Sequence, residues 1–294
     1  METPAQQRRH IDVIYNPTAG GRRRRRLQAV IALLQGSGSE VTLRPTSRPG
    51  DAEALTRDTK DVDVIVAAGG DGTINEVANG LLGRDTPLAL LPMGTANVIA
   101  AEIGLSAAPQ QIAGTILRGA IKKISLGRVN GRVFIAMVGV GYDARVVAGV
   151  NLGLKHLLGK GAYLVEAIIQ LIAGADHLLD VTIDGIDYRA ASVVVANGRY
   201  YAGRYVLDPS ARFTQPVLHV CLFERSGRWN FVRYSAALFN NRIGSLLDIR
   251  IVTGTTISIS GEAGEPVQLD GDVSTHLPAH IEVIPDAINL VMPI

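Results

Sequence analysis

A glycine-rich stretch, VIVAAGGDGTINEV (residues 64–77), places the carboxylate of Asp71 among the glycines Gly69, Gly70 and Gly72. The apolar run before the glycines predicts a buried strand, and α/β proteins bind ligands at the carboxyl ends of such strands. Backbone amides without Cβ atoms can approach a phosphate closely, and the following helix directs its positive end there. The stretch therefore predicts a phosphate-binding turn. The alternative is a tight strand-to-helix turn in which Asp71 only caps the helix.

Two further turns follow predicted strands in the same way. YNPTAGG (15–21) presents Asn16 and two glycines, and LLPMGTANV (90–98) presents Thr95 at the start of a helix. Each turn alone is typical of ordinary loop chemistry, but three such turns at strand ends of one sheet indicate a ligand site. Two known phosphate loops are excluded, because no G-x-x-x-x-G-K-[ST] occurs and G-x-G-x-x-G would need glycine at Asn75.

The first 120 residues or so alternate between strand and helix patterns, which would position these turns at one edge of a sheet. Strands that are apolar on both faces and alternate with helices predict a parallel sheet covered by helices on both sides. The expected strands are 11–16, 40–45, 62–68 and 87–92, and the expected helices are 22–35, 50–59, 74–82 and 95–103.

After about residue 120 the pattern changes to short strands. KKISLGRVNGRVFIAMVGVG predicts a hairpin with an Asn-Gly turn at 130–131, and a second strand pair turns near 184–185. Two helical stretches, 161–173 and 228–240, interrupt the strands. This pattern is typical of a β-rich fold rather than of a continued parallel sheet.

The change of pattern predicts two domains. We expect an α/β domain over residues 1–122 and a β-rich domain over residues 123–294. The sequence leaves open whether the last strands return to the first domain.

The composition is that of a soluble globular chain of 294 residues, of which 47% are hydrophobic and 19% charged. A net charge of +2 gives no reason to expect a nucleic-acid partner. The start of the chain has no apolar h-region, and the longest apolar helical stretch, AYLVEAIIQLIAGA, is too short and too polar to span a bilayer. We therefore expect a cytoplasmic protein. The single cysteine, Cys221, lies in the apolar run VLHVCLF, which predicts a core residue rather than a nucleophile.

The motifs together resemble one known family. IYNPTAGG, TSRPGDA, GGDGTINEVANGL and LLPMGTANVIA occur in the order and spacing of the diacylglycerol kinase-like lipid kinases, the superfamily that includes bacterial lipid kinases and sphingosine kinases. LDGDVS followed by HIEVIP is similar to the closing motif of that family. The resemblance covers nearly the whole chain. It implies an α/β nucleotide-binding domain, a β-sandwich-like lipid-binding domain and a site in the cleft.

The resemblance also implies an activity. The chain is identified as an ATP-dependent lipid kinase that uses Mg²⁺ and transfers the γ-phosphoryl group of ATP to a hydroxyl of a lipid such as diacylglycerol. Its partner would be a lipid substrate at the membrane surface, and a peripheral contact with the inner face of the membrane is compatible with this. The identity of the lipid and the oligomeric state stay open, and a homo-oligomer is compatible with the sequence.

Individual residues receive roles from the same resemblance. Asp71 is placed to act on the magnesium of ATP, directly or through water. Asp272, in the triplet Asp270-Gly271-Asp272, stands where the family usually has a glutamate that serves as general base. The sequence names no further metal ligands. The implied nucleotide-binding residues are Asn16, Thr46, Gly69, Gly70, Asp71, Gly72, Thr73, Asn75 and Thr95.

Three departures from the family pattern leave alternatives open. Val98 replaces an aspartate, although it could simply face the core, and Asp272 is one methylene shorter than the usual glutamate. Gln215-Pro216 replaces an aspartate-glycine pair that helps to hold a structural magnesium ion, and an amide is a poorer ligand for that ion. One alternative is an NAD kinase, which shares a GGDGT turn. Another is a nucleotide- or lipid-binding regulator without turnover.

A run of five arginines, Arg22–Arg26, follows the first glycine turn. Such a run is typical of a solvated helix face. However, five consecutive positions sweep all round a helix, and cations at a helix start oppose its dipole. The alternative is a cationic cluster that binds ATP phosphates or an anionic membrane surface.

Overall fold

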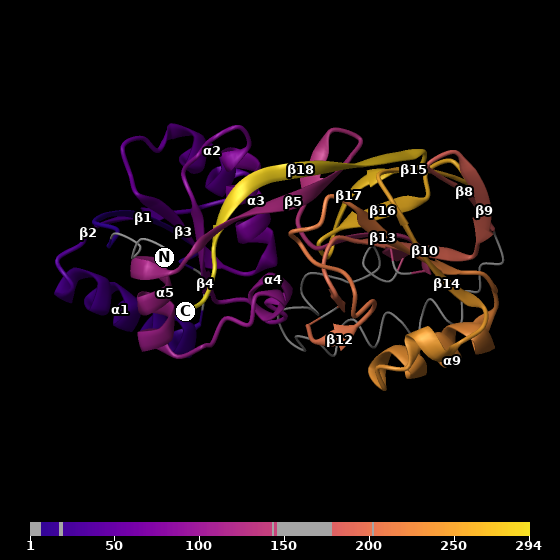
Figure 1. Ribbon diagram of the computed structural model, residues 1–294, viewed down its shortest axis with the longest axis horizontal. Coiled ribbons are helices and arrows are strands. Elements are labelled where there is room, and N and C mark those ends of the chain that lie inside the picture. The colour runs from indigo at the N-terminus through magenta and orange to yellow at the C-terminus, as the bar shows by residue number, and fades with distance from the viewer. Residues whose placement is uncertain (1–6, 18–19, 143, 146–177, 202) are drawn as a thin grey trace, which may run out of the picture. The chain divides into compact units, whose positions relative to one another are not determined.

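The computed structural model of the protein describes residues 7–17, 20–142, 144–145, 178–201 and 203–294 (Figure 1). The chain divides into two compact units. Unit 1 comprises Met1–Ile124 and Asp286–Ile294, and unit 2 comprises Ser125–Pro285. The C-terminal residues therefore belong to the unit that is formed by the first part of the chain.

The sheet of unit 1 is formed by β1 (His10–Tyr15), β2 (Glu40–Pro45), β3 (Val64–Gly69), β4 (Leu88–Pro92) and the end of β18 (Ala279–Val291). The order is β2-β1-β3-β4, and each neighbouring pair is parallel. The end of β18 lies beside β4, where Leu290 pairs with Leu88. β3 and β4 are buried at every position, as expected of strands that are covered on both faces. The predicted parallel sheet is confirmed.

The helices of unit 1 are α1 (Gly21–Gly36), α2 (Asp51–Asp58), α3 (Asp71–Leu81), α4 (Val98–Glu102) and α5 (Pro109–Arg118). Leu27 and Val30 of α1 join Ile112 of α5 and the strand residues Val13 and Val66 in one buried cluster. α2 and α3 pack against each other, and α3 contacts β3 and β4. The sequence patterns did not indicate α5, which begins with a proline, a residue favoured in the first helical turn.

Unit 2 is built from short strands in two sheets. The first sheet runs β14 (Ile249–Gly254), β13 (Leu218–Phe223), β10 (Ser192–Ala196), β7 (Met137–Gly141), β16 (Pro266–Leu269) and β17 (Asp272–His276). The second contains β18, β15 (Thr256–Ser260), β8 (Leu179–Ile183) and β9 (Ile186–Ala190). The strand pairs described in both sheets of this unit are antiparallel.

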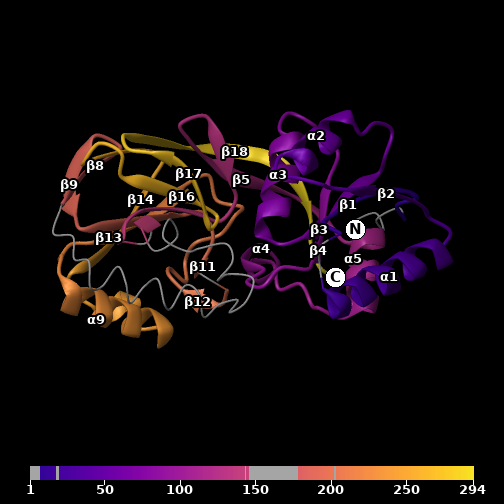
Figure 2. The ribbon, with the colours of Figure 1, turned by 180° about the vertical axis from the view of Figure 1, so that it is seen from behind.

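The other described elements of this part of the chain are hairpins, a helix and a 3₁₀ turn. β5 (Ile121–Val129) and β6 (Arg132–Phe134) form a hairpin, and β11 (Tyr200–Tyr201) pairs with β12 (Tyr205–Val206). The helix α9 (Arg228–Phe239) is followed by the 3₁₀ turn η1 (Ile243–Ser245). Both views of the molecule show α9 on the outside of this unit (Figure 2).

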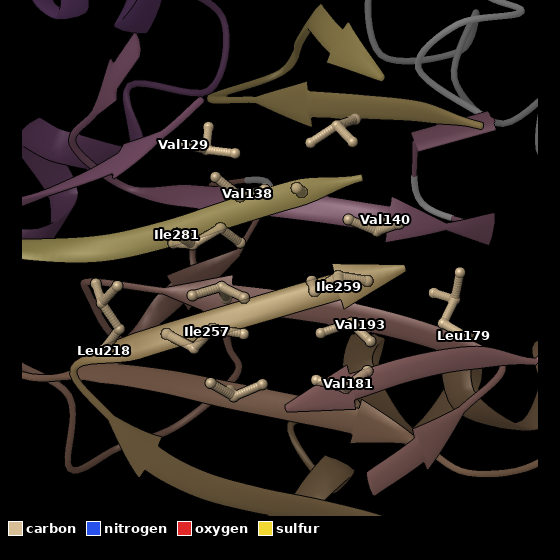
Figure 3. Close-up of a cluster of buried hydrophobic side chains, with 14 of the residues drawn as sticks. Val129, Val138, Val140, Leu179, Val181, Val193, Leu218, Ile257, Ile259 and Ile281 are labelled. Atoms are coloured by element: carbon tan, nitrogen blue, oxygen red, sulfur yellow. The ribbon is translucent and has the colours of Figure 1, made fainter. Parts of the chain in front are cut away.

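Alternate residues of the two sheets point into a shared core (Figure 3). Val138, Val140 and Val193 of the first sheet lie in one buried cluster with Ile257 and Ile259 of the second. A side-chain period of two is what a sandwich requires, because one face of each sheet is turned inward. The predicted β-rich, sandwich-like domain is confirmed.

The hairpin turns predicted at 130–131 and 184–185 are confirmed. Asn130 and Gly131 have φ angles of 47° and 84°, and Asp184 and Gly185 have 45° and 84°. Two successive positive φ angles match the twist of antiparallel strands, and Asn-Gly and Asp-Gly pairs adopt them at low cost.

Three other sequence-based expectations can be compared with the structure. The helix expected at 228–240 is α9, whereas the one expected at 161–173 lies outside the described residues. Cys221 is buried in β13, and burial raises the pKa of its thiol to about 12, so its interpretation as a core residue is confirmed. In the part of the chain that the structure describes, every helix is too short or too polar to cross a bilayer.

Candidate active site

The loops that follow the four parallel strands meet at the carboxyl edge of the unit 1 sheet. The backbone N–H of Thr46 donates to the carbonyl of Tyr15 (2.9 Å), and the N–H of Met93 donates to that of Gly69 (2.7 Å). The N–H of Asn16 donates in the same way to the end of β3 (3.3 Å). The structure thus brings together the loops that carry the predicted nucleotide-binding residues.

The glycines of these loops have a packing role of their own. Gly70 and Gly94 lie back to back: a Cβ atom on Gly94 would come within 2.6 Å of the Gly70 Cα, and one on Gly70 within 3.2 Å of the Gly94 Cα. Gly69 leaves room for the side chain of Thr73. The missing side chains therefore allow two backbones to touch, in addition to the predicted approach of a phosphate.

Asp71 is the first residue of α3, but its carboxylate serves a different helix. The N-cap residue of α3 is Gly70, and α3 has no side-chain cap, which argues against the alternative of a simple capping role. The Oδ1 atom of Asp71 instead accepts a hydrogen bond from the backbone N–H of Ile99 (3.3 Å) in α4. Burial raises the pKa of Asp71, and hydrogen bonds from the backbone of Ile99, Val98 and Asn97 oppose this rise. The half-buried carboxylate thus braces the loop after β4.

Asn97 closes that loop. Its φ angle is 49°, its Oδ1 accepts the N–H of Gly94 (2.7 Å), and its Nδ2 donates to the Gly94 carbonyl (3.0 Å). Asparagine tolerates this left-handed conformation better than most residues. Because of this turn, α4 begins at Val98 and not at residue 95 as predicted. Val98 is buried, which supports a core role at this position, and Thr95 is exposed on the loop.

A carboxylate also holds the loop that carries Thr46. The Oδ2 atom of Asp51 accepts hydrogen bonds from the Ser47 N–H (2.8 Å), the Ser47 hydroxyl (2.6 Å) and the Arg48 N–H (3.0 Å). These bonds, that of the Ser47 hydroxyl first, lower the pKa of Asp51 to about 2. Glu76 of α3 accepts two backbone N–H groups at the start of α2. This loop is therefore tied to the helix that follows the glycine turn.

The other predicted residues lie on α3. The helix begins three residues earlier than the predicted 74, so Gly72 and Thr73 belong to its first turn, Gly72 exposed and Thr73 half-buried. Asn75 is half-buried, and its side-chain oxygen accepts a hydrogen bond from Asn79 Nδ2 (2.9 Å). The predicted nucleotide-binding residues therefore share one edge of unit 1 with the start of α3, and their contact with a nucleotide stays a prediction.

The arginine run is divided by the packing of α1. Arg23 and Arg26 are half-buried: the Nη2 atom of Arg23 donates to the Thr95 hydroxyl (3.3 Å), and the Nη1 atom of Arg26 donates to the Pro92 carbonyl (2.8 Å). The other arginines of the run are exposed. The run of five identical residues was interpreted as one cluster, without a separate role for this pair. The available signal was the apolar face of the helix, because Arg23 lies four residues before Leu27 and Arg26 lies four residues before Val30.

Asp270 and Asp272 belong to unit 2 and have different environments. Residues 270–271 form the turn between β16 and β17, with positive φ angles of 48° and 94°. The Asp270 carboxylate accepts the backbone N–H groups of Ile135 (2.8 Å), Ala136 (2.9 Å) and Met137 (2.9 Å). Asp272 is the exposed first residue of β17. Asp270 therefore anchors the backbone before β7, and the assignment of the general base to Asp272 stays a prediction.

Gln215 and Pro216, which replace a metal-binding pair of the family, are exposed, and the Gln215 N–H donates to the Arg212 carbonyl (3.0 Å). Within the described ranges, no group of three or more His, Cys, Asp or Glu side chains is placed to hold a metal ion.

Both units match known family models. Residues 10–129 match the model of the diacylglycerol kinase catalytic domain. Residues 136–292 match the model of the YegS C-terminal NAD kinase beta sandwich-like domain.

Similar proteins agree with these matches. "Diacylglycerol kinase" of Bacillus subtilis (strain 168) is 26% identical over 292 residues, which cover 96% of this chain and 95% of that protein. "Probable lipid kinase YegS" of Salmonella newport (strain SL254) is 28% identical over 278 residues, 91% of each. A crystal structure of a diacylglycerol kinase from Bacillus anthracis (strain Sterne) superposes with a TM-score of 0.78 at 25% identity, covering 97% of both chains. The protein therefore belongs to the diacylglycerol kinase-like family of lipid kinases.

Proposed function

We propose that the protein transfers the γ-phosphoryl group of ATP to a hydroxyl of a lipid such as diacylglycerol. The observation that carries this proposal is the meeting of four strand-end loops at one edge of unit 1, beside the first turn of α3. Exposed backbone N–H groups and the positive end of a helix favour an anionic phosphate there. Family membership supports a lipid as the acceptor.

The residues at this edge fit a nucleotide that carries Mg²⁺. This ion binds through one or two carboxylates and several phosphate oxygens, and Asp71 supplies a half-buried carboxylate beside the glycine turn. When bound, the ion neutralises charge on the phosphate oxygens. The chain itself would bind the phosphates through the amides of Gly70 and Gly72, with Asn16 and Thr46 on the neighbouring loops.

The proton of the acceptor would be taken by Asp272. As the lipid hydroxyl oxygen forms its bond to the γ-phosphorus, the bond from that phosphorus to the β,γ-bridging oxygen breaks, and ADP leaves. The hydroxyl proton passes to the Asp272 carboxylate. Asp270 is less suited to this role, because its oxygens hold three backbone N–H groups.

The proposal is tested by incubation with γ-labelled ATP and a total lipid extract, with NAD as acceptor in a parallel reaction. We expect label in a lipid that co-migrates with a phosphorylated alcohol, and none in NAD. The NAD arm is needed because the second family model describes an NAD kinase-like sandwich. Label in NADP alone would establish the alternative activity, that of an NAD kinase. Binding of ATP without labelling of any lipid would establish a regulator.

Gly72→Val tests the phosphate contact separately from the fold. Gly72 is exposed on the first turn of α3, so valine should fold but should place a branched side chain where a phosphate would lie. We expect ATP affinity to fall at least tenfold with little change in melting temperature. Gly94→Ala is the contrasting variant, because its Cβ would meet the backbone of Gly70 and should lower stability. Unchanged ATP affinity in a folded Gly72→Val protein would contradict the phosphate-turn interpretation.

The two half-buried arginines should matter more for ATP than the exposed ones. Arg23→Gln removes a cation beside Thr95 at a helix end that has no acidic residue in its first turn. We expect the KM for ATP to rise by about tenfold, since a hydrogen bond to a charged group contributes roughly 1.5–3 kcal/mol. The control is the triple change of Arg22, Arg24 and Arg25 to glutamine, which should leave this KM nearly unchanged. An equal effect of both variants would assign the run to general surface charge.

A further inference from the structure

The helix α9 is apolar on two opposite sides. Its inner side includes Tyr234, which is 6% exposed and whose hydroxyl donates to the Asp248 carboxylate (2.8 Å). On the outer side, Trp229 is 86% exposed, Phe239 55% and Val232 41%. These residues recur at intervals of three and seven, so they lie on one helix face, opposite Tyr234. An exposed tryptophan among exposed apolar neighbours indicates a surface that meets an apolar partner.

The aromatic surface continues onto the hairpin β11–β12. The rings of Tyr205 and Phe239 meet edge to face with centroids 5.0 Å apart. The backbone N–H of Val206 donates to the Asn241 side chain (2.8 Å), which ties the hairpin to the end of α9. We call Trp229, Val232, Phe239 and Tyr205 the α9 face. Tryptophan and tyrosine are enriched where a protein meets the boundary between water and lipid.

The surroundings of the α9 face are cationic. From Arg225 through Leu247 the chain has four arginines, Arg225 included, and no acidic residue. Arg228 and Arg242 are exposed at the two ends of α9. The carboxylates that border this stretch are both paired: Asp248 is buried and forms ion pairs with Arg233 and Arg225, and Glu224 pairs with Arg250. An open depression between α9 and η1 is lined by Arg233 and Arg242. An anionic partner is therefore favoured over a neutral or a cationic one.

We propose that the α9 face docks on the surface of an anionic lipid bilayer. The inference rests on the proposed function in one respect, that a lipid kinase must reach a substrate held in a membrane. At 12 residues α9 is about 18 Å long, so it would lie in the plane of the interface with its apolar side in the headgroup region. A second copy of the chain fits less well, because a two-fold contact would bring the same arginines together.

The chain provides its own probe, because Trp229 is its single tryptophan. In water its emission should be that of an exposed indole. Addition of vesicles that contain phosphatidylglycerol should shift the emission to shorter wavelength, and brominated acyl chains in the same vesicles should quench it. Vesicles of phosphatidylcholine alone should have a much smaller effect. This measurement uses the unaltered protein and does not depend on catalysis.

Variants of the α9 face separate the apolar and the cationic contributions. Val232→Asp and Phe239→Asp should each lower vesicle affinity by roughly tenfold or more, because each removes apolar surface from the contact. Arg228→Gln and Arg242→Gln should each lower it by about fivefold at low salt, and less at high salt. The matched control is the glutamine triple of Arg22, Arg24 and Arg25 in unit 1, which should leave the Trp229 shift intact. Melting curves verify that each variant is folded.

Activity assays distinguish a failure of this proposal from a failure of the proposed function. Folded α9 variants should lose phosphorylation of diacylglycerol in anionic vesicles but keep it for a short-chain, monomeric diacylglycerol. Vesicle-dependent emission without phosphorylation of any lipid would support the α9 face and reject the kinase activity. An emission spectrum that is unchanged by anionic vesicles would overturn the proposal. So would a shift that depends on protein concentration in the absence of lipid, because it would show that a second copy covers this face.

Discussion

Asp272→Asn is expected to lower turnover by about 10²–10⁴-fold while ATP affinity stays close to that of the parent. A lipid alcohol is a poor nucleophile until its proton is removed, and asparagine keeps the shape of aspartate without accepting that proton. Because Asp272 is exposed at the start of β17, the change should leave the melting temperature nearly unchanged. Turnover measured with a dispersed lipid, and ATP binding measured by calorimetry, separate the two effects.

Two matched variants make this result specific to one carboxylate. Asp272→Glu restores the residue that the family usually has and should keep substantial activity. Asp270→Asn should act on stability instead, because an amide NH₂ would face a backbone N–H that now donates to Asp270. We expect its free energy of unfolding to fall by about 1–3 kcal/mol. A fully active Asp272→Asn protein beside a folded but inactive Asp270→Asn protein would assign the base to Asp270.

Asp71→Asn is expected to lower turnover by about 10²–10³-fold and to leave stability unchanged or slightly raised. The loss of activity follows from the loss of the carboxylate proposed to act on magnesium. The effect on stability follows from the environment, since burial raises the pKa of Asp71 and so disfavours its charged form. Asparagine can still accept the Ile99 N–H through its Oδ1 atom. A melting temperature between that of the parent and about 3 °C above it is expected.

The pH dependence of stability tests whether the raised pKa of Asp71 is the cause of the expected gain in stability of Asp71→Asn. A raised native pKa means that the stabilising contribution of protonated Asp71 is fully present below the unfolded pKa, near 3.9, and is lost as pH rises through the native value. The neutral asparagine has no such dependence. The stability advantage of Asp71→Asn should therefore be largest at neutral pH and shrink toward pH 4, in urea unfolding without nucleotide. A variant that is destabilised and yet binds ATP and turns over normally would make Asp71 a brace for α4 only.

Much of the fold follows from local patterns in the chain. Apolar runs such as VIVAA allow a strand that is covered on both faces, and unit 1 contains the parallel sheet that these runs predict. The turns at 130–131 and 184–185 also follow from local chemistry, because Asn-Gly and Asp-Gly pairs tolerate positive φ angles. The position of the glycine turns at one edge of the sheet follows too, since parallel strands place their carboxyl ends together.

The hydrogen-bond partners of the carboxylates could not be predicted from local patterns in the sequence. Asp270 and Asp272 stand two residues apart in LDGD, and their spacing gives no reason to separate them. They differ because the N–H groups that Asp270 accepts come from residues 135–137, far away in the sequence. Asp71 is a residue type that often caps helices, but its carboxylate accepts a hydrogen bond from Ile99 of α4, the next helix along the chain. Hydrogen bonds across such separations depend on the assembled fold.

Repeated or uniformly apolar segments carry still less information about their own orientation. Five identical arginines cannot indicate which of them face the protein, and the packing of α1 turns Arg23 and Arg26 toward the loop after β4. Gly70 and Gly94 belong to two separate glycine turns in the sequence, whereas in the structure they touch: a Cβ atom on Gly94 would collide with Gly70, and one on Gly70 would be tightly packed against Gly94. In α9, apolar residues on both sides make the buried side and the exposed side equivalent in sequence. Only contact with the sandwich distinguishes them, because it buries Tyr234 and leaves Trp229 in solvent.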